Sequence, residues 1–417
     1  MLRPIFWPVI VPSLLFAIGV GSTVPVLILS ALSLGASGAL ASAVVSLMGA
    51  ASLLLTVPVG ILIDKVGDRR AMILGTSAAV VITALLVLSL AGSLPTPFAL
   101  VMYVVLLMLL APVQDIWGLA RQAVVADRMP AMHMGRAMTA LGGTQRVGNL
   151  VGPMISALLL LWFPLWSVYI FSAACAVLAV VVLCIPALNR GFDSMGASTQ
   201  TTPTAAVADP NEPAAQKLKV RWKAVMLAGV AITILAIARA AQPTMIQLWG
   251  VHIDLHESGI SLLVALGAAL ELILMFPGGY IKDRLGRSVV LILCLAIFGA
   301  GFLVMAVQPT LAWTIMAVAV MAVGNGLGAG VNMTIGADLS PKVGRAKFLG
   351  IWAIFNNSGK LGGPAIVALL LSIATLPLAL VTTGVLTIVG AAWTATFART
   401  MDLPKGVHKR KTGRATR

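Results

Sequence analysis

Long apolar runs separated by short polar segments make up almost the whole chain. An apolar run of about 20 residues allows a helix to cross the roughly 30 Å hydrocarbon core of a bilayer. Such runs predict six spans in the first half, at 5–31, 37–62, 70–92, 98–124, 135–161 and 165–188. The second half predicts six more, at 222–248, 258–281, 288–306, 310–336, 345–372 and 377–398. The pattern therefore predicts an all-α polytopic membrane protein with twelve transmembrane helices, because a membrane β-barrel would alternate polar and apolar residues.

The composition agrees with this class, since 59% of the residues are hydrophobic and only 10% are charged. A soluble domain carries about 25% charged residues, so a soluble globular enzyme is excluded. Lys and Arg number 28 against 13 Asp and Glu, which gives a formal net charge of +15. These bases lie in short loops between apolar runs, as is typical of membrane proteins. We therefore expect no nucleic acid partner.

No sequence pattern indicates a cofactor, a metal site or catalysis. The Gly-x-x-x-x-Gly-Lys-[Ser/Thr] phosphate-binding motif does not occur, which argues against ATP-driven transport. Cys175, Cys184 and Cys294 lie in apolar runs without metal-ligand spacing. A short His/Asp/Glu cluster from His252 to Glu257 has a spacing that suits a loop better than a helical metal site. We therefore expect neither an enzyme nor a metalloprotein.

The polar segments predict the domain organisation and the orientation in the membrane. Residues 189–221 are rich in Ser, Thr, Pro and Ala, which predicts a flexible linker between bundles at 1–188 and 222–399, and 400–417 form a basic tail. The bases outside the spans lie at the N-terminus, in alternate loops and in the tail, so both termini are expected to be cytoplasmic. We expect a monomer in the plasma (inner) membrane, in contact with the lipid bilayer.

The two halves of the chain repeat the same motifs in the same order. Gly-x-x-x-Asp-[Lys/Arg]-x-Gly follows span two at Gly60 and span eight at Gly279, at an offset of 219 residues. Gly-x-x-x-Gly-Pro lies in span five at Gly148 and in span eleven at Gly359, at an offset of 211 residues. Because six spans separate the copies, we expect two bundles of the same orientation, related by a pseudo-twofold axis along the membrane normal.

With these motifs the chain resembles the major facilitator superfamily of secondary transporters over essentially its whole length. The Gly152-Pro153 element is similar to part of the motif of twelve-helix drug–proton antiporters, although Ile155-Ser156 stands where a Gly pair is usual. The resemblance implies that Gly60 lets span two approach span eleven closely and that Gly279 lets span eight approach span five. It also implies that the loop signature gates the cytoplasmic side, through Gly60, Asp64, Gly67, Arg69, Arg70, Gly279, Asp283, Arg284, Gly286 and Arg287. Alternatively, these bases only set the topology.

The repeated Gly-Pro pairs predict bends in spans five and eleven. A proline within a helix removes a backbone hydrogen bond and clashes with the preceding turn. The residues of the predicted bends are Gly148, Gly152, Pro153, Gly359, Gly363 and Pro364. An inert kink is the alternative to a functional bend.

Ionisable residues within the spans are functional candidates, because charge in hydrocarbon is costly. The acids are Asp115 and Glu271, and the helical rise places each about 18 Å from its cytoplasmic end. Four bases are predicted charge partners or substrate contacts in a central cavity: Arg121, Arg146, Arg239 and Lys360. Polar residues at similar levels line this cavity or join helices: Gln145, Asn149, Gln242, Asn332, Asn356 and Asn357.

Glu271, and after it Asp115, is the candidate for proton coupling, because a carboxyl group in a low-dielectric cavity can take up and release protons near neutral pH. A static ion pair is the alternative role. The resulting prediction is a proton-coupled secondary transporter of a small molecule that works by alternating access. The Gly-Pro motif favours export of an amphiphilic compound or drug. The excess of four bases over two acids favours uptake of an organic anion or zwitterionic metabolite, and lipid translocation on the same fold remains a third alternative.

Overall fold

We describe the protein from a computed structural model of the 417-residue chain. The structure describes residues 5–92, 94–128, 131–185, 220–341, 345–401 and 403. In these ranges every regular element is a helix. The predicted linker at 189–221 lies outside the described residues except for its last two, and the predicted tail at 400–417 lies outside them except for residues 400, 401 and 403.

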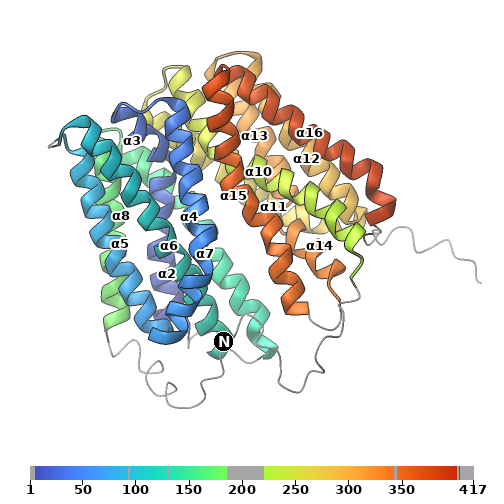
Figure 1. The fold of residues 1–417 in the computed structure, drawn as a ribbon, viewed down its shortest axis with the longest axis horizontal. Coiled ribbons are helices and arrows are strands. Elements are labelled where there is room, and N and C mark those ends of the chain that lie inside the picture. The colour runs from blue at the N-terminus through green and yellow to red at the C-terminus, as the bar shows by residue number, and fades with distance from the viewer. Residues whose placement is uncertain are drawn as a thin grey trace, which may run out of the picture. The chain divides into compact units, whose positions relative to one another are not determined.

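The helices follow the predicted apolar runs (Figure 1). In the first half they are η1 (Phe6–Ile10), α2 (Val11–Thr23), η2 (Val24–Val26), α3 (Leu27–Ser33), α4 (Gly38–Val66), α5 (Asp68–Leu90), α6 (Thr96–Arg128), α7 (Ala131–Leu159) and α8 (Trp166–Cys184). In the second half they are α10 (Trp222–His252), α11 (Glu257–Leu285), α12 (Arg287–Val307), α13 (Leu311–Leu327), α14 (Val331–Leu339), α15 (Arg345–Ile373) and α16 (Leu376–Met401). The prediction of an all-α membrane fold with twelve helical spans is confirmed.

Ten of these segments are long and apolar enough to cross a membrane by their length and composition. The ten include two interrupted segments, Phe6–Ser33 and Leu311–Leu339. Helices α7 and α15 have 29 residues each but are not among the ten. These two helices occupy the same position in the two repeats, and they carry many of the polar candidate residues. Their polarity therefore separates them from the remaining spans.

By their internal contacts the described helices form two compact units. Unit 1 contains the helices from η1 to α8 together with residues 246–265, which are the end of α10 and the start of α11. Unit 2 contains the rest of α10 and α11 together with α12 to α16. The boundaries predicted at residues 188 and 222 stay predictions, because the segment between them is almost entirely outside the described residues.

Two of the predicted spans contain an interruption. The run at 5–31 begins with a π-helical turn and contains a 3₁₀ turn at Val24–Val26, where Pro25 has no amide hydrogen to donate. The run at 310–336 breaks between Leu327 and Val331. The apolar runs locate both spans without indicating these interruptions, because hydrophobicity reports burial in lipid and does not report whether the backbone remains helical.

A glutamine side chain replaces a backbone hydrogen bond where the helix of the first span is interrupted. Within unit 1, Gln247 Nε2 donates to the carbonyl oxygen of Val24 at 3.0 Å, and Gln247 Oε1 accepts from the amide of Ile28 at 3.0 Å. Val24 and Ile28 are four residues apart, so an uninterrupted α-helix would join this carbonyl and this amide directly. The Gln247 amide therefore takes the place of one helical hydrogen bond. Tyr103 supports the next turn by donating from its hydroxyl to the carbonyl oxygen of Leu27 at 2.9 Å.

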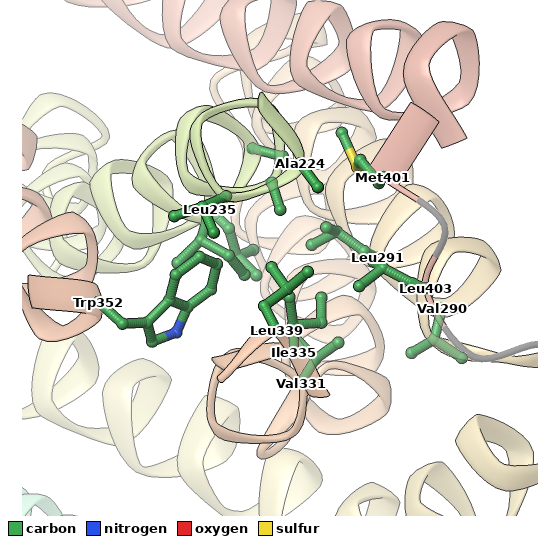
Figure 2. Packing of buried hydrophobic residues seen from close by; sticks show 14 of the residues in the cluster. Ala224, Leu235, Val290, Leu291, Val331, Ile335, Leu339, Trp352, Met401 and Leu403 are labelled. Carbon is green, nitrogen blue, oxygen red and sulfur yellow. The ribbon is translucent and has the colours of Figure 1, made fainter. Parts of the chain in front are cut away.

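The core of unit 2 is a cluster of buried apolar side chains from α10, α12, α14, α15 and α16. Figure 2 shows Ile335 and Leu339 on α14 pointing toward Leu235 and Leu291, with Trp352 at the edge of the cluster. Trp352 also donates from Nε1 to the carbonyl oxygen of Asn332 at 3.1 Å and to its Oδ1 at 2.9 Å. The short α14 is thus held by apolar packing on one side and by an indole hydrogen bond on another.

Candidate functional site

The loop signature has the same backbone conformation in both repeats. Gly67, between α4 and α5, has φ 86° and ψ 146°, and Gly286, between α11 and α12, has φ 90° and ψ 162°. This region of backbone dihedral angles is essentially restricted to glycine. The last glycine of each motif is therefore required by the tight connection between two helices, a role that the sequence motif alone does not specify.

Two basic residues of the signature, Arg69 and Arg287, have hydrogen-bond partners within their own units. Arg69 Nη2 donates to the carbonyl oxygen of Leu183 at 3.0 Å, near the C-terminus of α8, where a cation is favoured by the helix dipole. Arg287 Nε lies 3.3 Å from Asp338 Oδ2 at the end of α14. Both pairs tie the loop to a neighbouring helix end, and a role in gating stays a prediction.

The other members of the signature lie in different environments. The side chains of Asp64 and Arg70 are exposed. Arg284 lies over the ring of Tyr280 at 4.3 Å from its centroid. The surroundings of Gly279 and Asp283 are outside the described part of the structure.

Gly60 of α4 has no close neighbour among the described residues of unit 1. A Cβ atom built at Gly60 would meet no heavy atom within 4 Å. The approach expected at this glycine joins span two to span eleven, which belong to different units, so it stays a prediction.

The glycines of the Gly-Pro motifs make close helix contacts within each unit. In unit 1 a Cβ at Gly148 of α7 would lie 2.5 Å from the carbonyl oxygen of Ala17 in α2. In unit 2 a Cβ at Gly359 of α15 would lie 2.7 Å from the carbonyl oxygen of Ala236 in α10. Ala17 and Ala236 are themselves 219 residues apart, which is the offset of the repeat. Small residues let helices approach closely in membranes, so these motifs pack α7 on α2 and α15 on α10.

One turn further along, the second glycines of the two motifs make the same contact. Gly152 packs against the backbone at Gly21 of α2. A Cβ added at Gly363 would lie 2.6 Å from the carbonyl oxygen of Ile237 in α10. Ser156 Oγ then donates to the carbonyl oxygen of Ser22 at 2.5 Å. Pro153 and Pro364 lie inside α7 and α15. A functional bend at these prolines stays a prediction, whereas close packing is observed.

The acid predicted in unit 1 is hydrogen-bonded between two helices. Ser52 Oγ on α4 donates to Asp115 Oδ2 on α6 at 2.6 Å. Both side chains are half-buried. Serine is not distinctive in an apolar run, so the sequence did not indicate Ser52 as a partner.

The remaining unit 1 candidates belong to α6 and α7. Arg146 and Arg121 are half-buried, and Arg121 Nε has no hydrogen-bond partner among the described residues. Gln145 Nε2 donates to Asn149 Oδ1 at 3.2 Å, one turn along α7, and Asn149 is exposed. These two amides therefore bind each other on one helix and do not join neighbouring helices through this bond.

The acid predicted in unit 2 lies in a larger polar cluster. Asn325 Nδ2 on α13 donates to Glu271 Oε2 on α11 at 2.7 Å. Arg239 Nη2 on α10 donates to the carbonyl oxygens of Gly328 at 3.1 Å and of Asn325 at 3.5 Å. Asn325 thus contacts the acid with its side chain and the arginine with its backbone. No sequence pattern indicates that backbone carbonyls accept hydrogen bonds from Arg239.

The other unit 2 candidates are distributed over three helices. Lys360 on α15 is exposed, and Gln242 on α10 and Asn356 and Asn357 on α15 are half-buried. Asn332 on α14 accepts the hydrogen bond of the Trp352 indole. No cluster of metal-ligating side chains occurs among the residues that the structure describes.

The repeated motifs agree with the comparisons with known proteins. The sequence model of the Major Facilitator Superfamily matches residues 10–242 and 224–416. A crystal structure of a peptide transporter POT in complex with sulfate has a TM-score of 0.76 at 15% identity, over 96% of this chain and 95% of that chain. A POT family transporter in complex with 5-aminolevulinic acid has a TM-score of 0.72 at 12% identity, over 94% and 96% of the two chains.

These structural neighbours share the fold with this chain, and no curated protein sequence matches it. The match of the superfamily model extends over both repeats. From this match and from the repeated architecture we conclude that the chain belongs to the Major Facilitator Superfamily.

Proposed function

We propose that this protein is a proton-coupled transporter that takes up a small organic anion or zwitterionic metabolite by alternating access. The observation that supports it most is the hydrogen bond between Glu271 and Asn325 beside Arg239 in unit 2. A carboxylate within a membrane helix is costly and is usually retained for function. Neutralisation by a proton is the simplest change of charge that Glu271 can undergo during a transport cycle.

The charge balance within the spans supports an anionic or zwitterionic substrate. Four bases against two acids leave positive charge to be compensated, and Lys360 in particular is exposed on α15. The structural neighbours are named as peptide transporters or as transporters bound to 5-aminolevulinic acid. Although their low identity shows only the fold, these substrate names favour uptake over the alternative of drug export.

Export of an amphiphilic compound was predicted from the Gly152-Pro153 element. The packing of Gly148 and Gly152 against α2 accounts for this element without reference to the direction of transport. The experiment below therefore distinguishes uptake from export.

The test uses proteoliposomes that contain a pH-sensitive dye, with equal pH on both sides and the membrane potential clamped by valinomycin and potassium. A panel of dipeptides, amino acids, organic anions and lipophilic cations is added outside. Entry of a substrate together with protons acidifies the lumen, and entry in exchange for protons makes it alkaline. The sign does not depend on the orientation of the inserted protein, so it separates the two directions of coupling.

We expect acidification by an anion or zwitterion, and we expect Glu271→Gln to reduce it to the level of empty liposomes while substrate counterflow persists. Asp115→Asn tests the second candidate in the same assay. Glu257→Gln is the matched control, because Glu257 lies on the same helix and pairs with His256 with 41% of its side chain exposed. Alkalinisation by lipophilic cations would establish export instead. If both acid variants retained full proton movement, neither acid would carry the proton.

A further inference from the structure

At the interruption of the tenth span an arginine of another helix contacts backbone carbonyl groups. α13 ends at Leu327, and α14 begins at Val331 after Gly330, which is left-handed at φ 73° and ψ 3°. The last carbonyl groups of a helix have no partner within that helix. Inside a membrane such groups must be satisfied by the protein. Arg239 donates to the carbonyl oxygen of Asn325 in the last turn of α13, and to that of Gly328, which also accepts from the amide of Val331 at 3.1 Å.

The residues around the junction make room for this contact. Cys294 Sγ on α12 donates to the carbonyl oxygen of Gly324 at 2.9 Å and lies 4.0 Å from Arg239 Nη2. A Cβ at Gly328 would lie 2.7 Å from Arg239 Nη2 and would also collide with Cys294. The guanidinium group therefore reaches the backbone only because residue 328 is glycine. Its positive charge is also favoured at the C-terminus of α13 by the helix dipole.

Asn325 connects this junction to Glu271. Its carbonyl oxygen lies 3.5 Å from Arg239 Nη2, and its side-chain amide donates to Glu271 at 2.7 Å. The next residue, Gly326, also packs on α11, because a Cβ there would lie 3.2 Å from the backbone oxygen of Glu271. The last turn of α13 is therefore held between α10 on one side and α11 on the other.

We infer that Arg239 is a positioning residue, an internal cation that holds the α13–α14 junction in place. Through Asn325, the charge of Glu271 changes how firmly this junction is held. An ionised Glu271 makes a charge-assisted hydrogen bond to Asn325, and such bonds are about twice as strong as neutral ones. A neutral Glu271 leaves the last turn of α13 to the donors of Arg239 and Cys294. The inference rests on the proposed function only where it takes a proton as the agent that neutralises Glu271.

Hydrogen–deuterium exchange of the full-length protein in lipid nanodiscs tests the inference directly. Arg239→Ala is expected to increase exchange in a peptide that covers 325–334 by at least about tenfold, because opening of a backbone segment sets its exchange rate. Glu271→Gln, which mimics the neutral acid, is expected to increase it by a smaller factor. The internal control is the corresponding peptide of α6, at 114–123, which belongs to an uninterrupted helix and is expected to stay unchanged.

Two further measurements separate the charge from the hydrogen bonds. Guanidinium ions at millimolar, non-denaturing concentration are expected to restore slow exchange in Arg239→Ala, because they offer the same donors. Tetramethylammonium, which has the same charge and no N–H groups, is expected to have no effect. Gly328→Ala keeps the arginine and blocks its approach, so we expect the same increase as in Arg239→Ala. This variant also serves if Arg239→Ala does not fold.

Exchange at the wild-type rate in both Arg239→Ala and Gly328→Ala would overturn the inference. An increase of the exchange rate in these two variants, together with an unchanged rate in Glu271→Gln, would show that the charge of Glu271 does not act on the junction through Asn325. The exchange measurement does not depend on transport. Lumen acidification could therefore be absent, which would reject the proposed function, while the exchange results still decided whether Arg239 holds the junction.

Discussion

The two units of the protein have different contacts at positions that correspond in the repeat. In unit 1, Trp117 of the uninterrupted α6 is 2% exposed and stacks on Phe16, with ring centroids 4.8 Å apart. Its Nε1 donates to Thr76 Oγ1 at 2.6 Å. In unit 2, the residue 211 positions after Trp117 is Gly328, where the helix is interrupted and Arg239 contacts the backbone. One repeat therefore has a rigid aromatic contact where the other has a glycine junction held by a cation.

The acids of the two units also differ, although they lie at equivalent contacts between helices. Glu271 lies 219 residues after Ser52, and Asn325 lies 211 residues after Gln114, the neighbour of Asp115. Each unit thus joins the same pair of helices by a carboxylate and a neutral donor, α4 with α6 and α11 with α13. The acid is on α6 in unit 1 and on α11 in unit 2. The repeat preserves the place of the contact and not the residues that make it.

The largest expected effect on stability comes from removing the aromatic contact of unit 1. Trp117→Ala should lower the free energy of unfolding by about 3–5 kcal/mol, because it leaves a cavity and ends the stacking on Phe16. Thermal unfolding in detergent measures the change. Trp162→Ala is the control, since Trp162 is 71% exposed and should contribute little. Equal losses in the two variants would mean that Trp117 is not a rigid anchor of unit 1.

A smaller effect is expected where the two units are alike. Gly148→Ala and Gly359→Ala should each destabilise the protein by about 1–3 kcal/mol, because the added methyl group overpacks a backbone contact. Gly142→Ala on α7 is the matched control, since a Cβ there would meet no heavy atom within 4 Å. Unfolding midpoints compare the three. If Gly142→Ala were as harmful as Gly148→Ala, the loss would come from the helix itself and not from its contact with α2.

The smallest effect is expected for the hydrogen bond of the acid in unit 1. A double-mutant cycle of Ser52→Ala and Asp115→Asn should give a coupling energy of about 0.6 kcal/mol, the average for hydrogen bonds between membrane helices. The corresponding cycle of Asn325→Ala and Glu271→Gln should give a larger value, because Asn325 also belongs to the junction. Equal coupling in both units would remove the energetic difference between them.

Much of the fold could be predicted from the sequence, because each requirement of a membrane helix is local. The apolar runs locate the spans, including the start of α4 near residue 37 and of α16 near residue 377. The Gly-x-x-x-Asp and Gly-x-x-x-Gly-Pro patterns identify the repeat, and the structure gives Gly67 and Gly286 the same backbone conformation. The two interruptions could not be predicted with the same ease, because Pro25 and Gly330 stand among many prolines and glycines that lie inside helices.

The candidate site was predictable only in its charged members. Asp115, Glu271 and Arg239 are conspicuous because charge is rare in an apolar run. Their partners were not conspicuous, since Ser52 is a common residue and the acceptors of Arg239 are backbone carbonyls that every residue possesses. The glycines of spans five and eleven were attributed to bending, and their packing partners Ala17 and Ala236 carry no signal of their own.

The number of spans, their repeated order and the charges among them can be read from the residues alone, because hydrophobicity and helix length depend on one segment at a time. The tertiary structure sets which face of each helix meets a neighbour. It placed Asn325 between Glu271 and Arg239, Trp117 on Phe16 and Gln247 in the gap of the first span. These contacts depend on the rotation of each helix about its axis and on how closely two backbones approach, and the packing of all the helices in a unit sets both quantities.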